Sequence, residues 1–145
     1  MYVSQILKNK GTKVITAQAD DTVEHATSQL ARERIGAVVV VERGDRIAGI
    51  LSERDIAYGL ARHGHDLLKL RVSDLMTRQV ATCSLEDDTE TLMQMMTDRR
   101  VRHLPVLQGG TLAGIISIGD VVKARLSEMA VEMNELRDYV AGKTA

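Results

Sequence analysis

Hydrophobic and polar positions along the chain predict the same order of elements twice. In the first half, a short apolar segment at 14–17 predicts a strand. Apolar residues at helical spacing follow Asp21, which with Glu24 three positions later is typical of a capping box and predicts the helix N-cap at Asp21. The β-branched run 37–41 and the segment 47–51, joined by a Gly-Asp turn, predict a hairpin. A further helix is expected from Ser52 to about His63.

The second half predicts the same elements in the same order. They are a strand at 80–84, a helix at about 88–100, strands at 104–107 and 112–116, and a helix from Ser117. The linker 64–79 carries five apolar residues of the Leu and Val type, so we expect it to pack against the domain rather than to hang free. Each half therefore predicts a β-α-β-β-α unit.

An internal repeat supports this division. At an offset of 66 residues, Asp21 aligns with Asp87 and Arg34 with Arg100, and at an offset of 65 the segment Ala-Gly-Ile of 48–50 aligns with 113–115. One such unit leaves an apolar sheet face exposed, and pairing two copies buries both faces. We therefore expect a mixed α and β fold of two pseudo-twofold-related units packed sheet to sheet. The expected boundaries are 1–65 for the first repeat with an N-terminal strap, 66–79 for the packed linker, 80–128 for the second repeat, and 129–145 for a C-terminal helical extension.

Composition narrows the class of protein. The 145 residues carry a formal net charge of −1, no Phe or Trp and three Tyr, which disfavours a nucleic-acid binder, since that role needs basic surface and stacking side chains. The single cysteine, Cys83, excludes an intrachain disulfide. No signal-peptide pattern and no apolar run near the ~20 residues of a membrane span are seen. The expectation is a cytoplasmic, soluble domain that does not engage a membrane.

Both repeats carry Gly-apolar-apolar-Ser-x-x-Asp where a strand meets a helix, at 49–55 and at 114–120. One interpretation is a capping arrangement that satisfies free amides. The other is a nucleotide site: a helix N-terminus attracts phosphate, a carboxylate one turn along accepts both ribose hydroxyls, and the glycine lets a ligand approach the backbone. The duplication favours the nucleotide site.

These features together resemble the tandem CBS domain pair, also called a Bateman module, over essentially the whole chain. The resemblance depends on the segments Val-Ser-Asp-Leu-Met-Thr at 72–77 and Arg-His-Leu-Pro-Val at 102–106, and on the two Ser-x-x-Asp junctions. It implies regulatory binding of an adenosine-containing ligand such as AMP, ADP, ATP, NAD(H) or S-adenosylmethionine, with no catalytic cofactor. It also implies that the aspartate holds the ribose and that adenine rests against the first strand of the opposite repeat.

Carried over by position, the resemblance implies two clefts. One comprises Ser52 and Asp55 with Ala81, Thr82, Cys83, His103, Leu104 and Pro105; the other comprises Ser117 and Asp120 with Ile15, Thr16, Ala17, Gly36, Ala37 and Val38. We assign Arg102 to the Asp120 cleft as a phosphate contact and Arg54 to the Asp55 cleft as a phosphate partner of its own. Different affinities at the two clefts are expected.

The remaining signals concern partners and alternatives. Residues 122, 126, 129, 133, 136 and 140 form an a/d stripe that predicts either packing on the helix's own domain or, as we favour, a homodimer seam, with Gly142 ending the helix. Since no enzyme domain is attached, any output is expected to pass through a separate, unknown protein. The alternatives are a nucleotide-processing enzyme, for which His103 is the one candidate base, and a nucleic-acid-binding regulator. No metal site is expected, because His63 and His65 lack further ligands.

Overall fold

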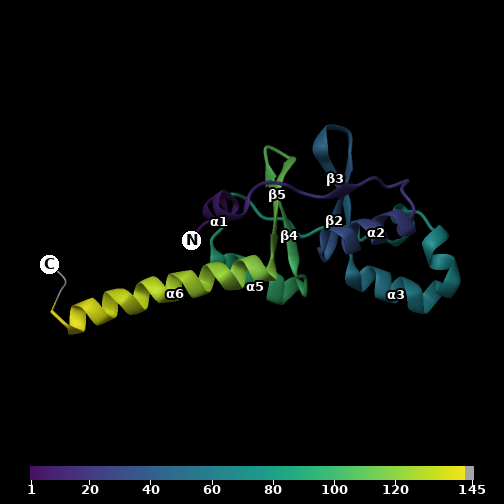
Figure 1. Ribbon diagram of the computed structural model, residues 1–145. Coiled ribbons are helices and arrows are strands. Elements are labelled where there is room, and N and C mark those ends of the chain that lie inside the picture. Colours follow the sequence, from purple (N-terminus) through teal and green to yellow (C-terminus); the bar gives the residue numbers. More distant parts are fainter. Residues whose placement is uncertain (143–145) are drawn as a thin grey trace.

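The computed structural model describes residues 1–142 and contains the two predicted units in chain order. The first unit and its flanking segments comprise α1 (Val3–Lys10), β1 (Thr16–Ala17), α2 (Val23–Glu33), β2 (Ala37–Glu42), the 3₁₀ turn η1 (Arg43–Asp45), β3 (Arg46–Ser52), α3 (Glu53–His63) and the 3₁₀ segment η2 (Gly64–Lys69). The second comprises α4 (Val72–Leu75), α5 (Thr89–Arg99), β4 (His103–Gln108), β5 (Thr111–Ser117) and α6 (Ile118–Val140). Figure 1 shows the strands of the two units side by side, with α2 and α3 at one end and α6 leaving at the other.

The two sheets follow the same plan. In the first, β1 runs parallel to β2, and β2 pairs antiparallel with β3. In the second, β4 pairs antiparallel with β5, and both hairpins carry a register irregularity at equivalent places, Val40/Val41 and Val106/Leu107. The strand predicted at 80–84 is reduced to a single parallel bridge between Cys83 and Val106. That bridge stands where β1 stands in the first unit.

The N-terminus of α2 differs from its prediction. Thr22, not Asp21, is the N-cap, and its side chain accepts from the backbone N–H of His25 at 3.1 Å. Asp21 instead closes the preceding turn, where its carboxylate accepts from the N–H of Gln18 at 2.8 Å. Because an Asp side chain can either cap a helix or accept from the N–H three residues before it, two adjacent polar residues leave the start ambiguous by one position. In the second unit Asp88 caps α5, as Thr22 caps α2.

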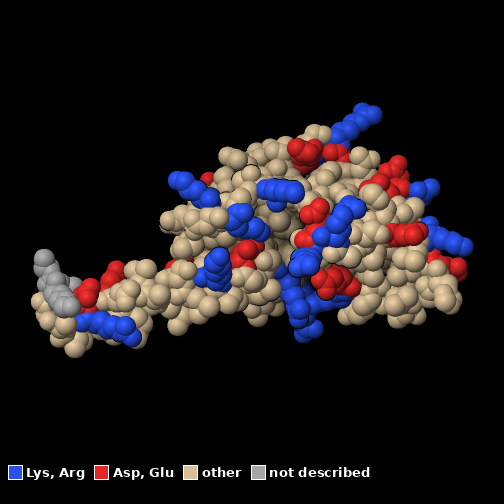
Figure 2. Space-filling model, viewed as in Figure 1, with Lys and Arg blue, Asp and Glu red and all other residues tan. Residues whose placement is uncertain are grey.

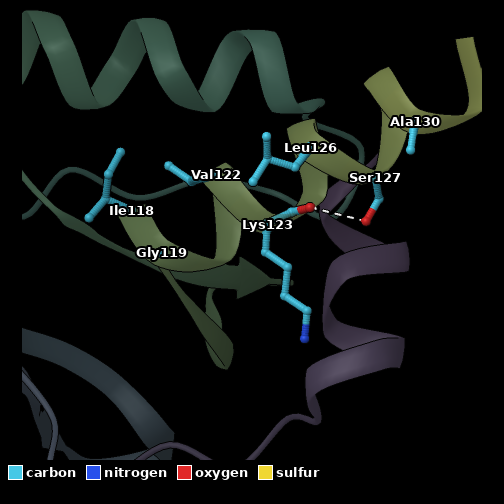
Figure 3. A pocket seen from close by; sticks show the side chains of 7 residues that line it. All are labelled: Ile118, Gly119, Val122, Lys123, Leu126, Ser127 and Ala130. Carbon is cyan, nitrogen blue, oxygen red and sulfur yellow. Dashed lines mark hydrogen bonds between the residues drawn. The ribbon is translucent and has the colours of Figure 1, made fainter. Parts of the chain in front are cut away.

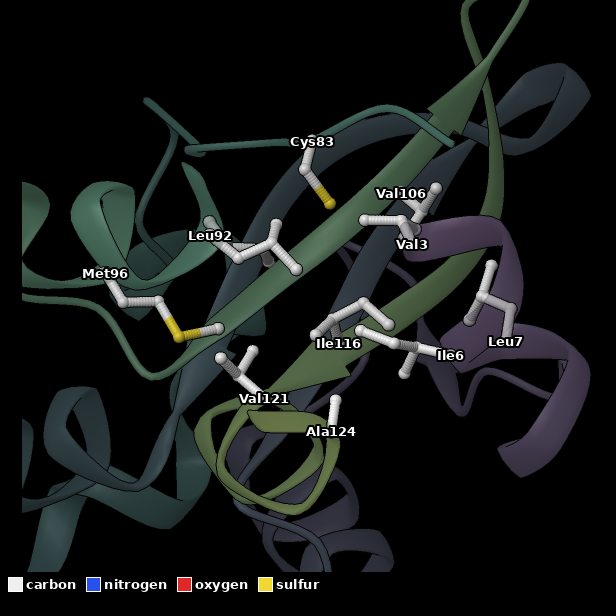
Figure 4. Close-up of a cluster of buried hydrophobic side chains, with 11 residues drawn as sticks. Val3, Ile6, Leu7, Cys83, Leu92, Met96, Val106, Ile116, Val121 and Ala124 are labelled. Carbon is white, nitrogen blue, oxygen red and sulfur yellow. The ribbon is translucent and has the colours of Figure 1, made fainter. Parts of the chain in front are cut away.

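Each unit is completed by the segment that precedes the other unit. Helix α1 comes before the first repeat, yet Val3, Ile6 and Leu7 are buried in the core of the second, against Ile116 and Val106 (Figure 4). Helix α4 comes before the second repeat, yet Val72 and Met76 belong to the core of the first. We use the term straps for two segments: α1 with the residues that follow it up to β1, and α4 with the residues that follow it up to Ala81.

Equivalent backbone hydrogen bonds attach the two straps. The N–H of Val3 donates to Asp87 at 2.8 Å and the N–H of Val72 donates to Asp21 at 2.8 Å. The second strap also forms a two-way bridge to β3: the N–H of Ile50 donates to the carbonyl of Thr77, and the N–H of Thr77 donates back, both at 2.9 Å. The straps are therefore part of the folded core.

The straps pack directly against Gly49 and Gly114, the equivalent glycines of the two repeats. A Cβ on Gly114 would lie 2.8 Å and 2.9 Å from the Cδ atoms of Leu7. A Cβ on Gly49 would lie 2.7 Å from the Sδ of Met76 and 2.8 Å from the carbonyl oxygen of Thr77. The expectation that these glycines let a ligand approach the backbone is wrong: the space above each of them is filled by a strap residue.

Helix α6 begins packed and ends exposed. Val121 and Ala124 are buried in the second core, and Glu128 accepts from the hydroxyl of the buried Thr89 at 2.8 Å. Beyond this point every residue from Met129 to Gly142 is exposed, and Figure 1 shows the helix projecting away from the globular part. The helix ends as predicted, with Gly142 in the left-handed region at φ 71°. Residues 143–145 of the predicted 129–145 extension lie outside the described residues.

Candidate functional site

The first candidate site is at the start of α3. Ser52 caps the helix, and one oxygen of Asp55 accepts from the backbone N–H of Ser52 at 2.9 Å and from its hydroxyl at 3.1 Å. The other oxygen accepts from the hydroxyl of Thr77 at 3.1 Å. Both Ser52 and Asp55 are half-buried. The capping interpretation of Ser-x-x-Asp is therefore correct, and it holds the carboxylate in a fixed orientation beside the strap.

The second candidate site repeats this geometry at the start of α6. Asp120 Oδ2 accepts from the N–H of Ser117 at 2.8 Å and from its hydroxyl at 2.9 Å. Here the strap supplies a cation: Lys10 Nζ lies 2.7 Å from the same Oδ2 and 2.9 Å from the carbonyl oxygen of Ile115. Burial raises the pKa of Asp120, but the hydrogen bonds from Lys10 and Ser117 and the ammonium charge outweigh burial and lower that pKa below its ordinary value.

Thr77 and Lys10 are the residues that sequence reasoning missed. Each comes from the strap that leads into the segment predicted to line the same cleft, Ala81–Cys83 for Asp55 and Ile15–Ala17 for Asp120. The signal available in the sequence is the likeness of residues 3–7 to residues 72–76, which marks the two segments as equivalent but does not say which unit each one joins. A lysine or a threonine does not by itself indicate a binding site, and only the packing of each strap brings these two side chains to the aspartates.

His103 lies between the two halves. A Cβ on Gly36 would lie 3.0 Å from the ring carbon Cε1 of His103 and 2.9 Å from the carboxylate of Glu53, so the imidazole rests against the backbone of the first unit. Burial lowers the pKa of His103 below its ordinary value of 6.5. The charges of Glu53 and Asp120 raise it, and those of Lys10 and Arg102 lower it further. The charged groups that act on this ring therefore come from the Asp120 site and from Glu53, whereas the sequence assigns His103 to the Asp55 cleft.

The two arginines predicted as phosphate contacts differ in their surroundings. The guanidinium of Arg54 donates to the carbonyl of Arg100 at 2.9 Å, across to the C-terminal end of α5 in the other unit. Arg102 is exposed, and its carbonyl accepts from the N–H of Ile118 at 2.8 Å, next to the start of α6. Arg54 therefore links the repeats, while the side chain of Arg102 lies on the surface near the Asp120 site.

The strand residues assigned to the clefts contribute mainly backbone. Val38 and Leu104 are fully buried in the two cores, and Ala17, Ala37, Cys83 and Pro105 are also buried. Ile15, Thr16, Ala81, Thr82 and Gly36 are half-buried. Burial, with the nearby charge of Asp87, raises the pKa of the Cys83 thiol to about 12, so the thiol stays protonated at neutral pH and is a poor nucleophile.

Two hollows lie along α6. A cavity of about 110 Å³ next to Asp120 is lined by Met1, Ile6, Asn9, Lys10, Lys123, Ala124 and Ser127 as well. A shallow groove of about 540 Å³ runs over Ile118, Val122 and Leu126, whose side chains share one face of the helix while Lys123 points toward α1 (Figure 3). The first hollow adjoins a predicted site residue, and the second includes Val122 and Leu126 from the start of the predicted dimer stripe.

Two further observations concern the part of the chain that the structure describes. It contains no group of three His, Cys, Asp or Glu residues placed to hold a metal ion, and His63 and His65 are both exposed. None of its helices is both long enough and apolar enough to cross a membrane.

Known proteins are similar to this chain in sequence and in fold. The "CBS domain-containing protein CBSX3, mitochondrial" of Arabidopsis thaliana is 34% identical over 97% of this chain and 72% of its own length. The crystal structure of the CBS-domain containing protein ATU1752 from Agrobacterium tumefaciens is 43% identical, with a TM-score of 0.84 over 86% of this chain and 99% of that one. The CBS domain pair of protein MJ0100, solved with 5-methylthioadenosine and S-adenosyl-L-methionine, shares the fold at 23% identity, with a TM-score of 0.76 over 86% of this chain and 98% of that one.

The family model agrees with the repeat found in the sequence. The model named CBS domain matches residues 3–62 and again residues 72–127, one match for each unit together with the strap that precedes it. The chain therefore belongs to the CBS domain family and consists of two such domains in tandem.

Proposed function

We propose that this protein is a non-catalytic regulatory module that binds an adenosine-containing ligand at one or both Ser-x-x-Asp sites. The observation that carries the proposal is the duplicated site itself. In both copies a half-buried aspartate is fixed at a helix start by a serine cap and faces the strap that packs on the same unit. The fold is compatible with such ligands, since the MJ0100 pair was solved with two adenosyl compounds.

Each site has the groups that a nucleoside needs. The carboxylates of Asp55 and Asp120 accept hydrogen bonds from vicinal ribose hydroxyls, and the helix starts at Ser52 and Ser117 offer positive potential to a phosphate. The chain at 15–17 and 36–38, and at 81–83 and 103–105, supplies backbone and small aliphatic surface against which adenine packs. Arg102 donates hydrogen bonds to the phosphate at the Asp120 site. Arg54, beside the Asp55 site, holds the two repeats together through its hydrogen bond to the carbonyl of Arg100.

Calorimetry with AMP, ADP, ATP, NAD, NADH and S-adenosylmethionine tests this proposal. We expect at least one of them to bind, and we expect Asp55→Asn and Asp120→Asn to weaken binding unequally. Asparagine retains an acceptor for the serine cap, so these variants keep the helix start. The matched control is Asp88→Asn, which alters the N-cap aspartate of α5 in a helix outside both sites. If no ligand binds, or if Asp88→Asn weakens binding as much as the site variants do, the proposal fails.

Regulation follows from differential binding. A ligand that prefers one packing of the two repeats shifts the equilibrium toward it, and a partner protein that recognises that packing receives the signal. A nucleotide-processing enzyme would need a base at the reacting group, and His103, the one candidate, is packed against Gly36. Chromatography of ATP, NADH and S-adenosylmethionine after incubation with the protein distinguishes the two, because turnover would favour the enzyme.

A nucleic-acid-binding regulator is the weaker alternative. On the face seen in Figure 2 basic and acidic side chains are intermingled over the globular part, with no continuous basic surface. Steep salt dependence of DNA binding would favour that alternative. We also propose a cytoplasmic location, which the single cysteine, buried and unpaired, supports.

We further propose that α6 pairs with α6 of a second copy of this chain. The stripe at 122, 126, 129, 133, 136 and 140 is exposed by 47 to 78% in a single copy, so its own domain does not cover it. In a parallel pair, Glu132 lies next to the partner's Arg137, an attractive g–e contact. An antiparallel pair centred on the stripe places Lys123 next to the partner's Arg137 and the two Glu132 side chains next to each other. The charges therefore favour a parallel pair.

The dimer is tested by sedimentation of Met133→Lys against Val131→Lys. Met133 is 51% exposed within the stripe and Val131 is 56% exposed outside it. We expect a dimer for the unaltered protein and for Val131→Lys, and a monomer for Met133→Lys. A monomeric unaltered protein, or a dimer that tolerates Met133→Lys, contradicts the proposal.

A further inference from the structure

The two sites differ in the side chain that the strap brings to the aspartate. At Asp55 it is the neutral hydroxyl of Thr77, 3.1 Å from Oδ1. At Asp120 it is the ammonium of Lys10, 2.7 Å from Oδ2. The side chains of Lys10 and Asp120 are 30% and 21% exposed, so this pair stands at the edge of the protein, within reach of a ligand.

The surroundings of Lys10 are suited to an anion. The ammonium has three donors, of which Asp120 and the carbonyl of Ile115 take two, and the third is available to a ligand. The adjoining cavity of about 110 Å³ also has Lys123 in its wall. About 10–15 Å³ of such space holds one water, so this cavity has room for a group the size of a phosphate. Lys10 and Arg102 both act on the pKa of His103, which places two cations near that ring.

We propose that Lys10 makes the Asp120 site selective for phosphorylated adenosine ligands, such as AMP, ADP and ATP, over uncharged adenosine. The inference rests on the proposed function of this site. As ribose hydroxyls donate to the Asp120 carboxylate, they replace Lys10 as its donors, and the ammonium pairs with the phosphate. Without Lys10, no positive charge from the strap would offset the repulsion between the phosphate and the Asp120 carboxylate. At the Asp55 site Thr77 supplies no charge, so that site discriminates less between AMP and adenosine.

The test compares AMP with adenosine by calorimetry in an Asp55→Asn background, which leaves the Asp120 site as the one measured. For Lys10→Met we expect the preference for AMP over adenosine to fall about tenfold or more, the size expected for the loss of one charge-assisted hydrogen bond. The affinity for adenosine is expected to stay or rise, because its ribose no longer competes with an ammonium for the carboxylate. Lys10→Arg keeps the charge and should keep the preference.

Controls separate selectivity from strap packing. Lys8→Met removes an exposed lysine of the same helix and should leave the preference unchanged. If Lys10→Met weakens AMP and adenosine equally, or if Lys10→Arg behaves like Lys10→Met, Lys10 is only an anchor for the strap and the inference is overturned. If the unaltered protein binds none of the six ligands tested above, the proposed function itself fails. If it binds another of the six but neither AMP nor adenosine, this inference alone fails. If it binds both and Lys10→Met changes nothing, this inference alone fails.

Discussion

Replacing Gly49 by alanine tests whether the straps hold the fold together. The added Cβ would lie 2.7 Å from Met76 Sδ and 2.8 Å from the carbonyl oxygen of Thr77, where ordinary contacts begin at 3.4 Å. The methionine can rotate away, but the carbonyl belongs to the backbone. That carbonyl accepts from the N–H of Ile50 at 2.9 Å, within the two-way bridge between strap and strand. The strap must therefore shift by roughly half an ångström, and the bridge weakens.

The magnitude follows from these contacts. Overpacking of a filled core costs about 1–3 kcal/mol, and weakening a backbone hydrogen bond adds about 1 kcal/mol. Alanine returns about 0.4–1 kcal/mol by restricting the unfolded chain. We expect Gly49→Ala to lower the free energy of unfolding by about 2–3 kcal/mol, or the Tm by roughly 5–10 °C for a chain of this length. Gly114→Ala should cost less, because the atoms it meets are the flexible Cδ ends of Leu7.

Urea unfolding followed by circular dichroism at one fixed protein concentration measures these values. Gly119→Ala is the matched control: nothing lies closer to its Cβ than Ser117 Oγ at 3.7 Å, and the residue is in the first turn of α6. We expect this variant to be as stable as the unaltered protein or up to about 1 kcal/mol more stable. An unfolding free energy of Gly49→Ala within ~0.5 kcal/mol of the unaltered protein would refute the reasoning, as would a larger loss in Gly114→Ala.

Two other predictions concern the second strap contact and pH. Leu7→Ala should lower the free energy of unfolding by about 2–5 kcal/mol, because Leu7 is 4% exposed in the second core. The double variant with Gly114→Ala should lose less than the sum of the two single losses, because the shortened side chain makes room for the new methyl group. Additive losses in urea unfolding would show that the two residues do not touch. Because the folded-state pKa of His103 is lowered, stability should be unaffected above the unfolded pKa of about 6.5 and fall as pH drops below it toward the folded value. His103→Asn should remove that part of the pH dependence, and an unchanged pH profile would contradict this.

The sequence predicted both Ser-x-x-Asp junctions because their signal is local, and the repeat because the two halves resemble each other position by position. Strand-to-helix junctions depend on short-range spacing and on caps, so Ser52 and Ser117 were identifiable as helix starts. The exchange of straps was not, since the apolar residues of α1 fit the core of either unit equally well in the sequence. For the same reason Lys10 and Thr77 could not be assigned to the aspartates: their contacts span 110 and 22 residues of chain.

The sequence also could not show which of two neighbouring, chemically similar side chains takes a given role. Asp21 and Thr22 both make good N-caps, and the turn closed at Gln18 decided between them. Strand 80–84 failed to form at full length because only Cys83 pairs with β4. Arg54 was predicted as a phosphate partner at the Asp55 cleft, and its contact with the other unit was not expected. The carbonyl of Arg100, at the end of α5 where the chain turns left-handed at φ 54°, accepts a hydrogen bond from its guanidinium.

The exchange of straps has a consequence for how the molecule melts. Either half, taken as a contiguous stretch of chain, lacks three or more core side chains that only the other half provides: Val3, Ile6 and Leu7 in one direction, Val72 and Met76 with Leu75 in the other. Neither half then has a complete interior by itself, so the two are expected to unfold in one concerted transition. Cleavage of the chain within η2 should yield pieces that recover native structure only when mixed.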